Sequence, residues 1–277
     1  MKRLFSLLML IALFAVISAC KNLPTKSKII KPLPTESLMV IESLPTATNM
    51  VIEPSATVIE YSPVVSETKT EQSVIKEDLS GNYQSGEYVV FGSYEQDNNQ
   101  ANGKEPIEWL VLERQGNNML LISRYALDCK QYHSVLKSVT WETSSLHSWL
   151  NGTFLNEAFS AEEQMIIQST LVSADKNPTF DTNPGNSSTD KIFLQSITEA
   201  KSYFTSDSAR QVEATKYAKA KGAYIGFDGY AWCWLRSPGY DSEKAAGIMT
   251  SGGVDDFGDD VYGDVCGAIR PVMWVSQ

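Results

Sequence analysis

The chain has 277 residues, 33 acidic and 23 basic side chains, and a formal net charge of −10. Residues 1–80 carry equal numbers of acidic and basic side chains, so the whole negative charge belongs to residues 81–277. An acidic surface disfavours nucleic acid and anionic membranes as partners for a basic face. We therefore expect no nucleic-acid partner.

Residues 1–20 have the three parts of a secretory signal peptide. A basic start precedes an apolar run, Leu4 to Ile17, which is shorter than the ~18 residues that span a bilayer. Ile17-Ser18-Ala19-Cys20 resembles the bacterial lipobox, in which the cysteine is lipidated and becomes the first residue. Ordinary cleavage near Ala19 is the alternative. Lipidation of Cys20, with palmitate-type chains, predicts a lipoprotein anchored to the extracytoplasmic face of the cell membrane.

Residues 21–80 have the composition of a tether. They hold six of the chain's eleven prolines, many Ser and Thr residues, and no Gly, Trp or Phe. Proline at this density disfavours helices and sheet interiors. We expect a disordered, extended spacer here, followed by a single globular domain over residues 81–277 that is long enough for one core.

The folded domain begins with three predicted strands. Gly86–Tyr94, Pro106–Arg114 and Met119–Arg124 are rich in apolar and β-branched residues. Gln115–Asn118 predicts a hairpin turn between the second and third strands. The second strand has no cleanly polar face, which indicates a central position in its sheet.

Helices are predicted next. Ser145–Leu150 reads as a short amphipathic turn that ends at Asn151-Gly152. Capping boxes open three further helices, and Gly222 follows the last of them as a natural C′ residue. These boxes are Ser160 with Glu163, Ser196 with Glu199, and Ser208 with Gln211. A long loop over 175–190 and a short strand at Lys191–Gln195 lie between the first two boxes.

The last strands frame an acidic, Gly-rich stretch. They are predicted at Trp232–Leu235, Gly247–Thr250 and Ile269–Val275. Strands at both ends of a helical region predict an α+β fold, with the first and last strands paired. The acidic stretch between the last two is expected to be a loop, and we take it as the candidate ligand surface.

Several stretches resemble a bacterial family known only as a domain of unknown function. They are Gly-Glu-Tyr-Val-Val-Phe-Gly-Ser-Tyr from 86, Trp-Glu-Thr-Ser-Ser-Leu-His-Ser-Trp-Leu-Asn-Gly from 141, Trp-Leu-Arg-Ser-Pro-Gly from 234 and Ile-Arg-Pro-Val from 269. The family is common in secreted and surface proteins of Gram-positive bacteria. The resemblance covers residues 84–276 and implies a C-type-lectin-like fold, similar to that of formylglycine-generating enzymes. In that fold a long loop before the last strand presents the ligand site.

The candidate ligand loop combines carboxylates with aromatic rings. Its residues are Asp255, Asp256, Phe257, Asp259, Asp260, Tyr262 and Asp264, with Tyr240 beside them. Calcium takes six to eight oxygen ligands, so a calcium site at Asp255, Asp256, Asp259 and Asp260 is one interpretation. A solvated acidic turn is the other, and the spacing is not that of an EF-hand. Exposed Tyr and Phe rings also suit sugar faces, whereas the six tryptophans sit in apolar patterns that are typical of core.

Residues on either side of this loop are expected to hold it in place. Arg236 and Arg270 are predicted to be buried partners of carboxylates that hold the loop, and Trp234 to belong to the same scaffold. A disulfide between Cys233 and Cys266 would join the flanking strands, and free buried thiols are the alternative. Cys129 and His133 are four residues apart, but such sequence neighbours seldom form a catalytic pair.

Three functions remain open at this point. The first is a ligand-binding module for an extracellular glycan, peptide or protein, displayed on a tether. The second is an enzyme of formylglycine-generating type or another extracytoplasmic hydrolase. The third is a structural or assembly factor of the envelope. The chain lacks a close cysteine pair for copper and any hydrolase or nucleotide motif, which favours the binding module.

Overall fold

The computed structural model describes Leu79, residues 81–263 and residues 266–277. All of them belong to the second of two units into which the chain divides, Val65–Gln277. The predicted signal peptide with Cys20, the predicted tether apart from Leu79, and Asp264 lie outside the described residues.

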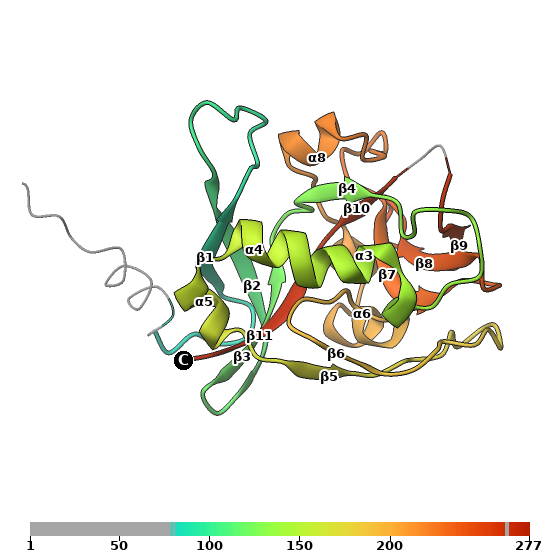
Figure 1. Ribbon diagram of the computed structural model, residues 1–277, viewed down its shortest axis with the longest axis horizontal. Helices are drawn as coiled ribbons and strands as arrows, with labels where there is room; N and C mark the ends of the chain where they lie inside the picture. Colours follow the sequence, from blue (N-terminus) through green and yellow to red (C-terminus); the bar gives the residue numbers. More distant parts are fainter. Residues whose placement is uncertain (1–78, 80, 264–265) are drawn as a thin grey trace, which may run out of the picture. The chain divides into compact units, whose positions relative to one another are not determined.

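Two main sheets and one hairpin make up the strands of the domain (Figure 1). A four-stranded antiparallel sheet has the order β1 (Tyr88–Tyr94), β2 (Glu105–Gln115), β3 (Asn118–Ser123), β11 (Val272–Ser276). A five-stranded sheet has the order β4 (Asp128–Lys130), β10 (Gly267–Ile269), β7 (Cys233–Pro238), β8 (Lys244–Ile248), β9 (Val254–Asp260). The hairpin pairs β5 (Thr170–Val172) with β6 (Ser188–Asp190).

Short helices connect these strands. They are η1 (Trp141–Thr143), α3 (Ser145–Trp149), η2 (Leu150–Phe154), α4 (Leu155–Ala158), α5 (Ala161–Ile166), α6 (Ile197–Tyr203), α7 (Asp207–Arg210) and α8 (Lys216–Ala220). This mixture confirms the α+β class. None of the helices in the described part of the chain has the length and apolar character that crossing a membrane requires.

The hairpin between β2 and β3 is confirmed. Gln115 pairs with Asn118, and the two-residue turn contains Gly116 at a φ of 61°. Positive φ at the turn matches the right-handed twist of the flanking strands, which glycine allows without steric cost. β2 lies between β1 and β3, so its predicted central position is confirmed as well.

The chain passes from one sheet to the other at two places that lie side by side. β3 leads to β4, and β10 leads to β11 through Arg270 and Pro271. β11 pairs with β3, so the prediction that the first and last strands pair is wrong. β1 instead occupies the opposite edge of the same sheet. A sequence pattern identifies strands but not their neighbours, because pairing depends on contacts between distant segments.

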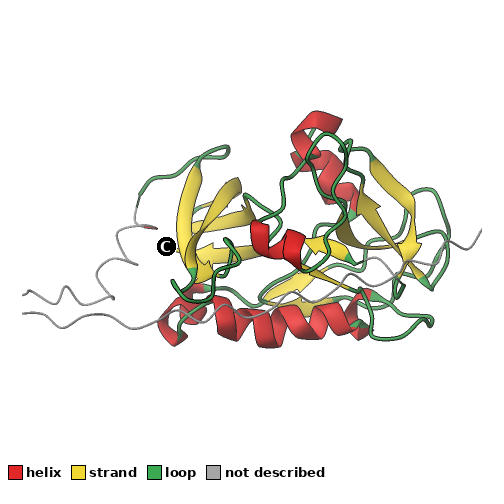
Figure 2. Ribbon diagram, turned by 90° about the horizontal axis from the view of Figure 1, so that it is seen from above, coloured by secondary structure: helices red, strands yellow, loops and turns green. Residues whose placement is uncertain are grey.

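One continuous helical segment, formed by α3, η2 and α4, runs along both sheets (Figure 1, Figure 2). The predicted end at Asn151-Gly152 is therefore wrong. The Asn151 side chain accepts hydrogen bonds from the backbone N–H groups of Lys191 and Ile192, at 2.8 and 3.1 Å. It thus binds a neighbouring segment, and the apolar residues on either side of it continue into the core.

The capping boxes have mixed outcomes. Those of Ser160 and Ser196 are confirmed at the starts of α5 and α6. The predicted helix from Ser208 to Gly222 is wrong, because two short helices flank an extended segment. In that segment Ala214 forms a bridge with Ala126. The predicted C′ role of Gly222 agrees with its φ of 103° after α8.

The region between α5 and α6 also departs from prediction. The expected loop over 175–190 is confirmed over 175–187, whereas its last three residues form β6, which pairs with β5. The expected strand at Lys191–Gln195 is wrong, since Phe193 forms only an isolated bridge with Val272. Hydrogen bonds in both directions, at 2.8 and 2.9 Å, still attach this segment to β11.

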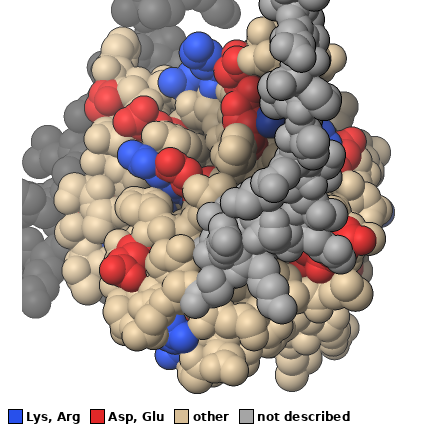
Figure 3. Space-filling model, turned by 90° about the vertical axis from the view of Figure 1, so that its left-hand side faces the viewer, with Lys and Arg blue, Asp and Glu red and all other residues tan. Residues whose placement is uncertain are grey.

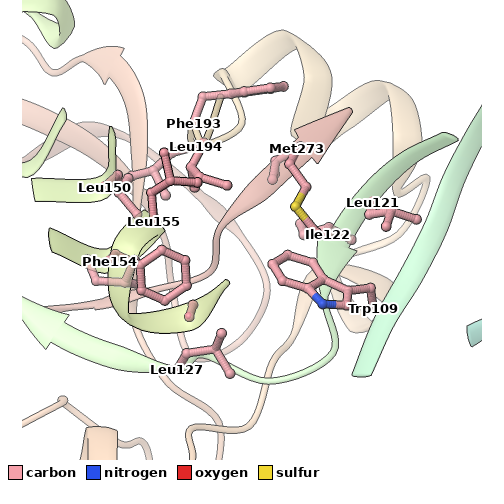
Figure 4. Close-up of a cluster of buried hydrophobic side chains, with 14 of the residues drawn as sticks. Trp109, Leu121, Ile122, Leu127, Leu150, Phe154, Leu155, Phe193, Leu194 and Met273 are labelled. Carbon is pink, nitrogen blue, oxygen red and sulfur yellow. The ribbon is translucent and has the colours of Figure 1, made fainter. Parts of the chain in front are cut away.

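The main core lies between the four-stranded sheet and the long helical segment. Trp109, Phe154 and Met273 meet there from β2, η2 and β11 (Figure 4). Trp109 is fully buried, and its indole N–H donates to the backbone oxygen of Phe91 at 2.7 Å. The other tryptophans are buried or packed against the core, as their apolar patterns predict.

Charge is mixed on the face of the domain shown in Figure 3. Acidic and basic side chains lie close together there, between larger uncharged areas. The visible described surface thus presents both signs rather than a broad basic area of the kind that binds nucleic acid.

Candidate functional site

The acidic stretch is a strand, so the prediction of a loop over 254–260 is wrong. β9 is the edge strand of the five-stranded sheet, and its backbone pairs with β8 from Val254 to Asp260. The pairing is irregular near Gly258, whose φ is 77° and whose missing Cβ would lie 2.4 Å from the Ala245 oxygen. Aspartate has a low propensity for strands. It is accommodated here because β9 pairs along one side only and its side chains reach solvent.

Each of the four described aspartates in this strand has a partner within the protein. Asp255 accepts from the Gly258 N–H at 3.0 Å, and Asp260 forms an ion pair with Lys244 at 2.5 Å. Asp256 accepts from the Thr179 hydroxyl at 2.5 Å, and Asp259 from the next backbone N–H at 2.8 Å. These contacts stabilise the strand without a cation. Calcium at these residues therefore stays a prediction.

A different acidic group has metal-ligand spacing. Within the described residues, Glu95, Asp97 and Glu105 form the one group of three whose ligand atoms lie within 4.8 Å of one another. Backbone N–H groups already bind these carboxylates, for example Gln96 to Glu105 at 2.7 Å. Hydrogen bonds within the connection between β1 and β2 therefore account for the closeness of these three carboxylates.

Three aromatic rings meet on the surface beside β9. We call Phe180, Tyr240 and Phe257 the aromatic cluster. Tyr240 and Phe257 stack with centroids 4.6 Å apart and planes 7° apart, and Phe180 meets both edge-on at 5.9 and 6.0 Å. Tyr240 is 46% exposed and Phe257 51% exposed. The cluster therefore presents a fixed aromatic surface to solvent.

Three separate segments supply these rings, and two buried polar side chains join them. Asn177 donates from its side-chain amide to the backbone oxygens of Pro238 and Asp256, at 2.9 and 2.7 Å. The Thr182 hydroxyl contacts the backbone oxygens of Gly239 and Tyr240, at 2.8 and 2.9 Å. Loop 173–187 is thereby fastened to β9 and to the turn between β7 and β8.

The aromatic cluster has charged neighbours in sequence and one lysine close in space. Each ring is next in sequence to an aspartate: Asp181, Asp241 or Asp256. The Lys244 ammonium lies 5.9 Å from the Phe257 ring centroid, and its hydrogen bond to Asp260 raises the pKa of Lys244. The site thus combines flat apolar faces with acceptor oxygens and one fixed cation.

Sequence reasoning identified two of the three rings. Tyr240 and Phe257 belong to the predicted ligand surface and lie together. Phe180 was missed, because its loop gave no signal beyond turn-forming residues. Tyr262 is exposed after β9, but no ring contact joins it to the aromatic cluster in the described structure.

Arg236 holds the base of the same loop, and its expected pairing with carboxylates is observed. Its guanidinium forms ion pairs with Glu199 and with Asp175, the latter at 3.4 Å. It also donates to the backbone oxygens of Ser173 and Leu194, at 3.2 and 2.8 Å. One buried cation thus links β7, loop 173–187 and α6.

Trp234 is buried under the sheet. Its indole N–H donates to the backbone oxygen of Lys130 at 2.9 Å, and its ring packs edge-on against Trp232 at 4.5 Å. It therefore connects β7 to β4, away from the aromatic cluster.

Arg270 lacks the carboxylate partner that its sequence position suggested. Its Nε donates to the Ser123 backbone oxygen at 3.0 Å, and the guanidinium lies 5.3 Å from the Phe204 ring centroid. No carboxylate forms an ion pair with it among the described residues. Burial lowers the pKa of Arg270 to about 10. The prediction is wrong because Arg270 lies at the crossing of the sheets, where no described carboxylate is within ion-pair distance.

The disulfide joins Cys129 to Cys266, with Cα atoms 5.7 Å apart, so the expected pairing of Cys233 with Cys266 is wrong. β10 lies between β4 and β7, and its neighbour β4 was not predicted. Cys233 is a buried free thiol, and burial raises its pKa to about 12.

Both histidines have defined roles. The His133 ring accepts from the Ser145 backbone N–H at 3.1 Å, and burial lowers its pKa. Cys129 is oxidised, so the two cannot act as a nucleophile and base. His147 instead pairs with buried Asp190 at 2.7 Å, which also accepts from the Trp141 indole at 2.9 Å. This pair, distant in sequence, was not predicted.

The chain is similar to one described protein family. The family described as a domain of unknown function, DUF6273, matches residues 116–277. No curated protein and no solved structure matches the chain. β1 and β2 precede the match, although they complete its four-stranded sheet. Because the match covers more than half of the chain, this protein belongs to the DUF6273 family.

Proposed function

We propose that residues 81–277 form a ligand-binding module and that the aromatic cluster is its contact surface. The observation that carries this proposal is the ordered, solvent-facing arrangement of Phe180, Tyr240 and Phe257. Rigid aromatic side chains provide large contact area at little cost in conformational entropy. The buried side chains of Asn177 and Thr182 keep the rings in place before a ligand arrives.

An extracellular glycan is the ligand class that this chemistry favours over a peptide or protein. The C–H face of a sugar ring packs on an aromatic ring, and its hydroxyls donate to carboxylates. Asp181 and Asp241 follow Phe180 and Tyr240 in sequence and are the candidate acceptors. An acidic rim also disfavours anionic ligands by charge repulsion.

The finer fold assignment and the location belong to the same proposal. A C-type-lectin-like fold is supported by the placement of β1 and β11 in one sheet, with the helices between them in sequence. A lipid on Cys20 would anchor the module to the extracytoplasmic face of the membrane, and the proline-rich tether would give it reach. The membrane and the glycan are then its two partners.

An extracytoplasmic enzyme is the second candidate, and His147 with Asp190 favours it. A buried carboxylate that orients an imidazole is a component of many hydrolases. The binding module ranks first because no nucleophile is hydrogen-bonded to the His147 ring in the described structure.

A glycan array and a cell-wall pulldown with the purified full chain test the proposal. Tyr240→Ala or Phe257→Ala should weaken binding about 5- to 30-fold, since loss of a stacked ring costs roughly 1–2 kcal/mol. Tyr262→Ala is the matched control, because Tyr262 is equally exposed but lies outside the aromatic cluster. Equal losses in all three variants would contradict the assignment. Absence of binding together with turnover of an ester or peptide, abolished by His147→Asn, would favour the enzyme.

A further inference from the structure

The Lys244 side chain shows what kind of group the aromatic cluster can hold. Its ammonium lies over the Phe257 ring, 5.9 Å from the centroid, and forms an ion pair with Asp260 at 2.5 Å. The negative face of an aromatic ring attracts an ammonium, and a hydrogen-bonded carboxylate adds to that attraction. One ring of the cluster and one aspartate thus already bind a positive charge that belongs to the protein itself.

The stack of Tyr240 on Phe257 has a second outer face, which no cation of the described residues occupies. The two rings lie 4.6 Å apart with planes 7° apart, so each covers one face of the other. Phe180 is nearly equidistant from both centroids, at 5.9 and 6.0 Å, and therefore lies beside the stack rather than over it. Lys244 is over Phe257, and Tyr240 is 46% exposed. The outer face of Tyr240 is thus the one open to a ligand.

Carboxylates outnumber cations near this stack. The hydrogen bond to Asp260 raises the pKa of Lys244, and the charges of Asp259 and Asp241 raise it further, so three carboxylates lie near one ammonium. Only Asp260 forms an ion pair with Lys244, and the other two carboxylates have no ion pair with any described residue.

Asp241 is the carboxylate best placed to serve the open ring. It follows Tyr240 directly in the chain, in the turn between β7 and β8. Its side chain accepts from the backbone N–H two residues further on, at 2.9 Å, which fixes its position. An exposed ring and a fixed carboxylate without a cation are therefore neighbours in the same turn.

We propose that the aromatic cluster binds its glycan through a protonated amino group, so that unacetylated amino sugars are preferred over their N-acetylated forms. This inference rests on the proposed function. The sugar ammonium lies over the outer face of Tyr240 and pairs with Asp241. On the other side of the stack, Lys244 has the same relation to Phe257 and Asp260. A neutral sugar gains the ring contact alone, and an anionic sugar is repelled.

Calorimetric titration of the full chain with two oligosaccharides of equal length tests this inference. One consists of glucosamine and the other of N-acetylglucosamine, so they share a backbone and differ in charge. At a pH below the pKa of its amino groups, the glucosamine oligosaccharide should bind about 5- to 20-fold more tightly, because it adds a cation–π contact and an exposed ion pair. A pH above that pKa, or added salt, should remove most of this preference.

Asp241→Asn removes the charge but keeps an acceptor for the backbone N–H, so it should fold and reduce the preference about 2- to 5-fold. Its binding of the N-acetylglucosamine oligosaccharide should be unchanged. Asp228→Asn is the matched control, because Asp228 also accepts from the backbone N–H two residues further on but lies in a different turn, outside the aromatic cluster.

Equal binding of the two oligosaccharides, or tighter binding of the N-acetylated one, would overturn this inference. If Tyr240→Ala still weakened that binding, the aromatic cluster would remain the glycan contact and the proposed function would stand. Equal losses of preference in Asp241→Asn and Asp228→Asn would also overturn the inference, because the charge would then act from the whole surface. Binding of neither oligosaccharide overturns it too, and the glycan array then decides separately on the proposed function.

Discussion

Loss of the Cys129–Cys266 disulfide should destabilise the domain strongly. The bond joins residues 137 positions apart, so it restricts a long segment of the unfolded chain. The chain-entropy relation gives about 5 kcal/mol for a loop of this length, and measured disulfides contribute roughly 2–4 kcal/mol. We therefore expect reduction to lower the free energy of unfolding by about 2–5 kcal/mol. For a domain of this size, that loss corresponds to roughly 5–15 °C in melting temperature.

Urea unfolding with and without a phosphine reductant measures this loss. The variant Cys129→Ala/Cys266→Ala should resemble the reduced wild type and show no further response to reductant. Cys233→Ala is the matched control: it removes the buried free thiol, costs about 1 kcal/mol, and keeps the response to reductant.

Thiol counting decides the pairing itself. Denatured, unreduced residues 79–277 should show one reactive thiol, from Cys233, and native protein none, because that thiol is buried with a raised pKa. If Cys233→Ala rather than Cys129→Ala abolished the response to reductant, the pairing would be wrong. If reductant changed nothing while the thiol count rose to three, the entropy reasoning would fail.

Asn177→Ala leaves two buried backbone oxygens unpaired, so it should cost about 1–3 kcal/mol in urea unfolding and also weaken glycan binding; unchanged binding would separate the loop from the site. Melting in calcium and in EDTA tests the cation hypothesis: a shift lost in Asp255→Asn/Asp256→Asn but kept in Glu105→Gln would support it, and equal melting temperatures would remove it. Stability should fall as the pH drops below 6.5, because the lowered pKa of His133 means that the unfolded state binds a proton which the folded state does not. His133→Gln should reduce this loss of stability at acid pH, and an unchanged dependence of stability on pH would assign the loss to other groups.

Local features of the fold were predictable from sequence. Gly116 allows the hairpin turn, and Ser160 and Ser196 cap helices through contacts within four residues. Trp109 is in the core, as expected of a strand whose middle residues are apolar on both faces. Such features depend on neighbours in sequence, so a single chain reveals them.

The predictions that were wrong concern features that depend on residues far away in sequence. The Asn151 side chain binds the backbone at 191–192, so Asn151-Gly152 does not end its helix. β9 exists because β8 offers a free edge, and its aspartates alone suggested a loop. Cys129 became the disulfide partner through the three-residue strand β4, which is too short to recognise by pattern.

Only part of the candidate site was predictable from sequence, for the same reason. Composition placed Tyr240 and Phe257 in exposed connections, and Arg236 met the carboxylates expected of a buried arginine. Phe180 and the fastening role of Asn177 arise only when loop 173–187 folds onto β9. Their long sequence separation hides them from any local signal.

The two side-by-side crossings between the sheets have a consequence for folding order. β3 requires β11 as its neighbour, and β4 requires β10, so neither sheet is complete until the segment from Cys266 to Ser276 is in place. Such long-range pairing slows folding, because the entropy cost of closing the intervening chain must be overcome before these contacts form. Docking of residues 266–276 is therefore the event that completes both sheets together.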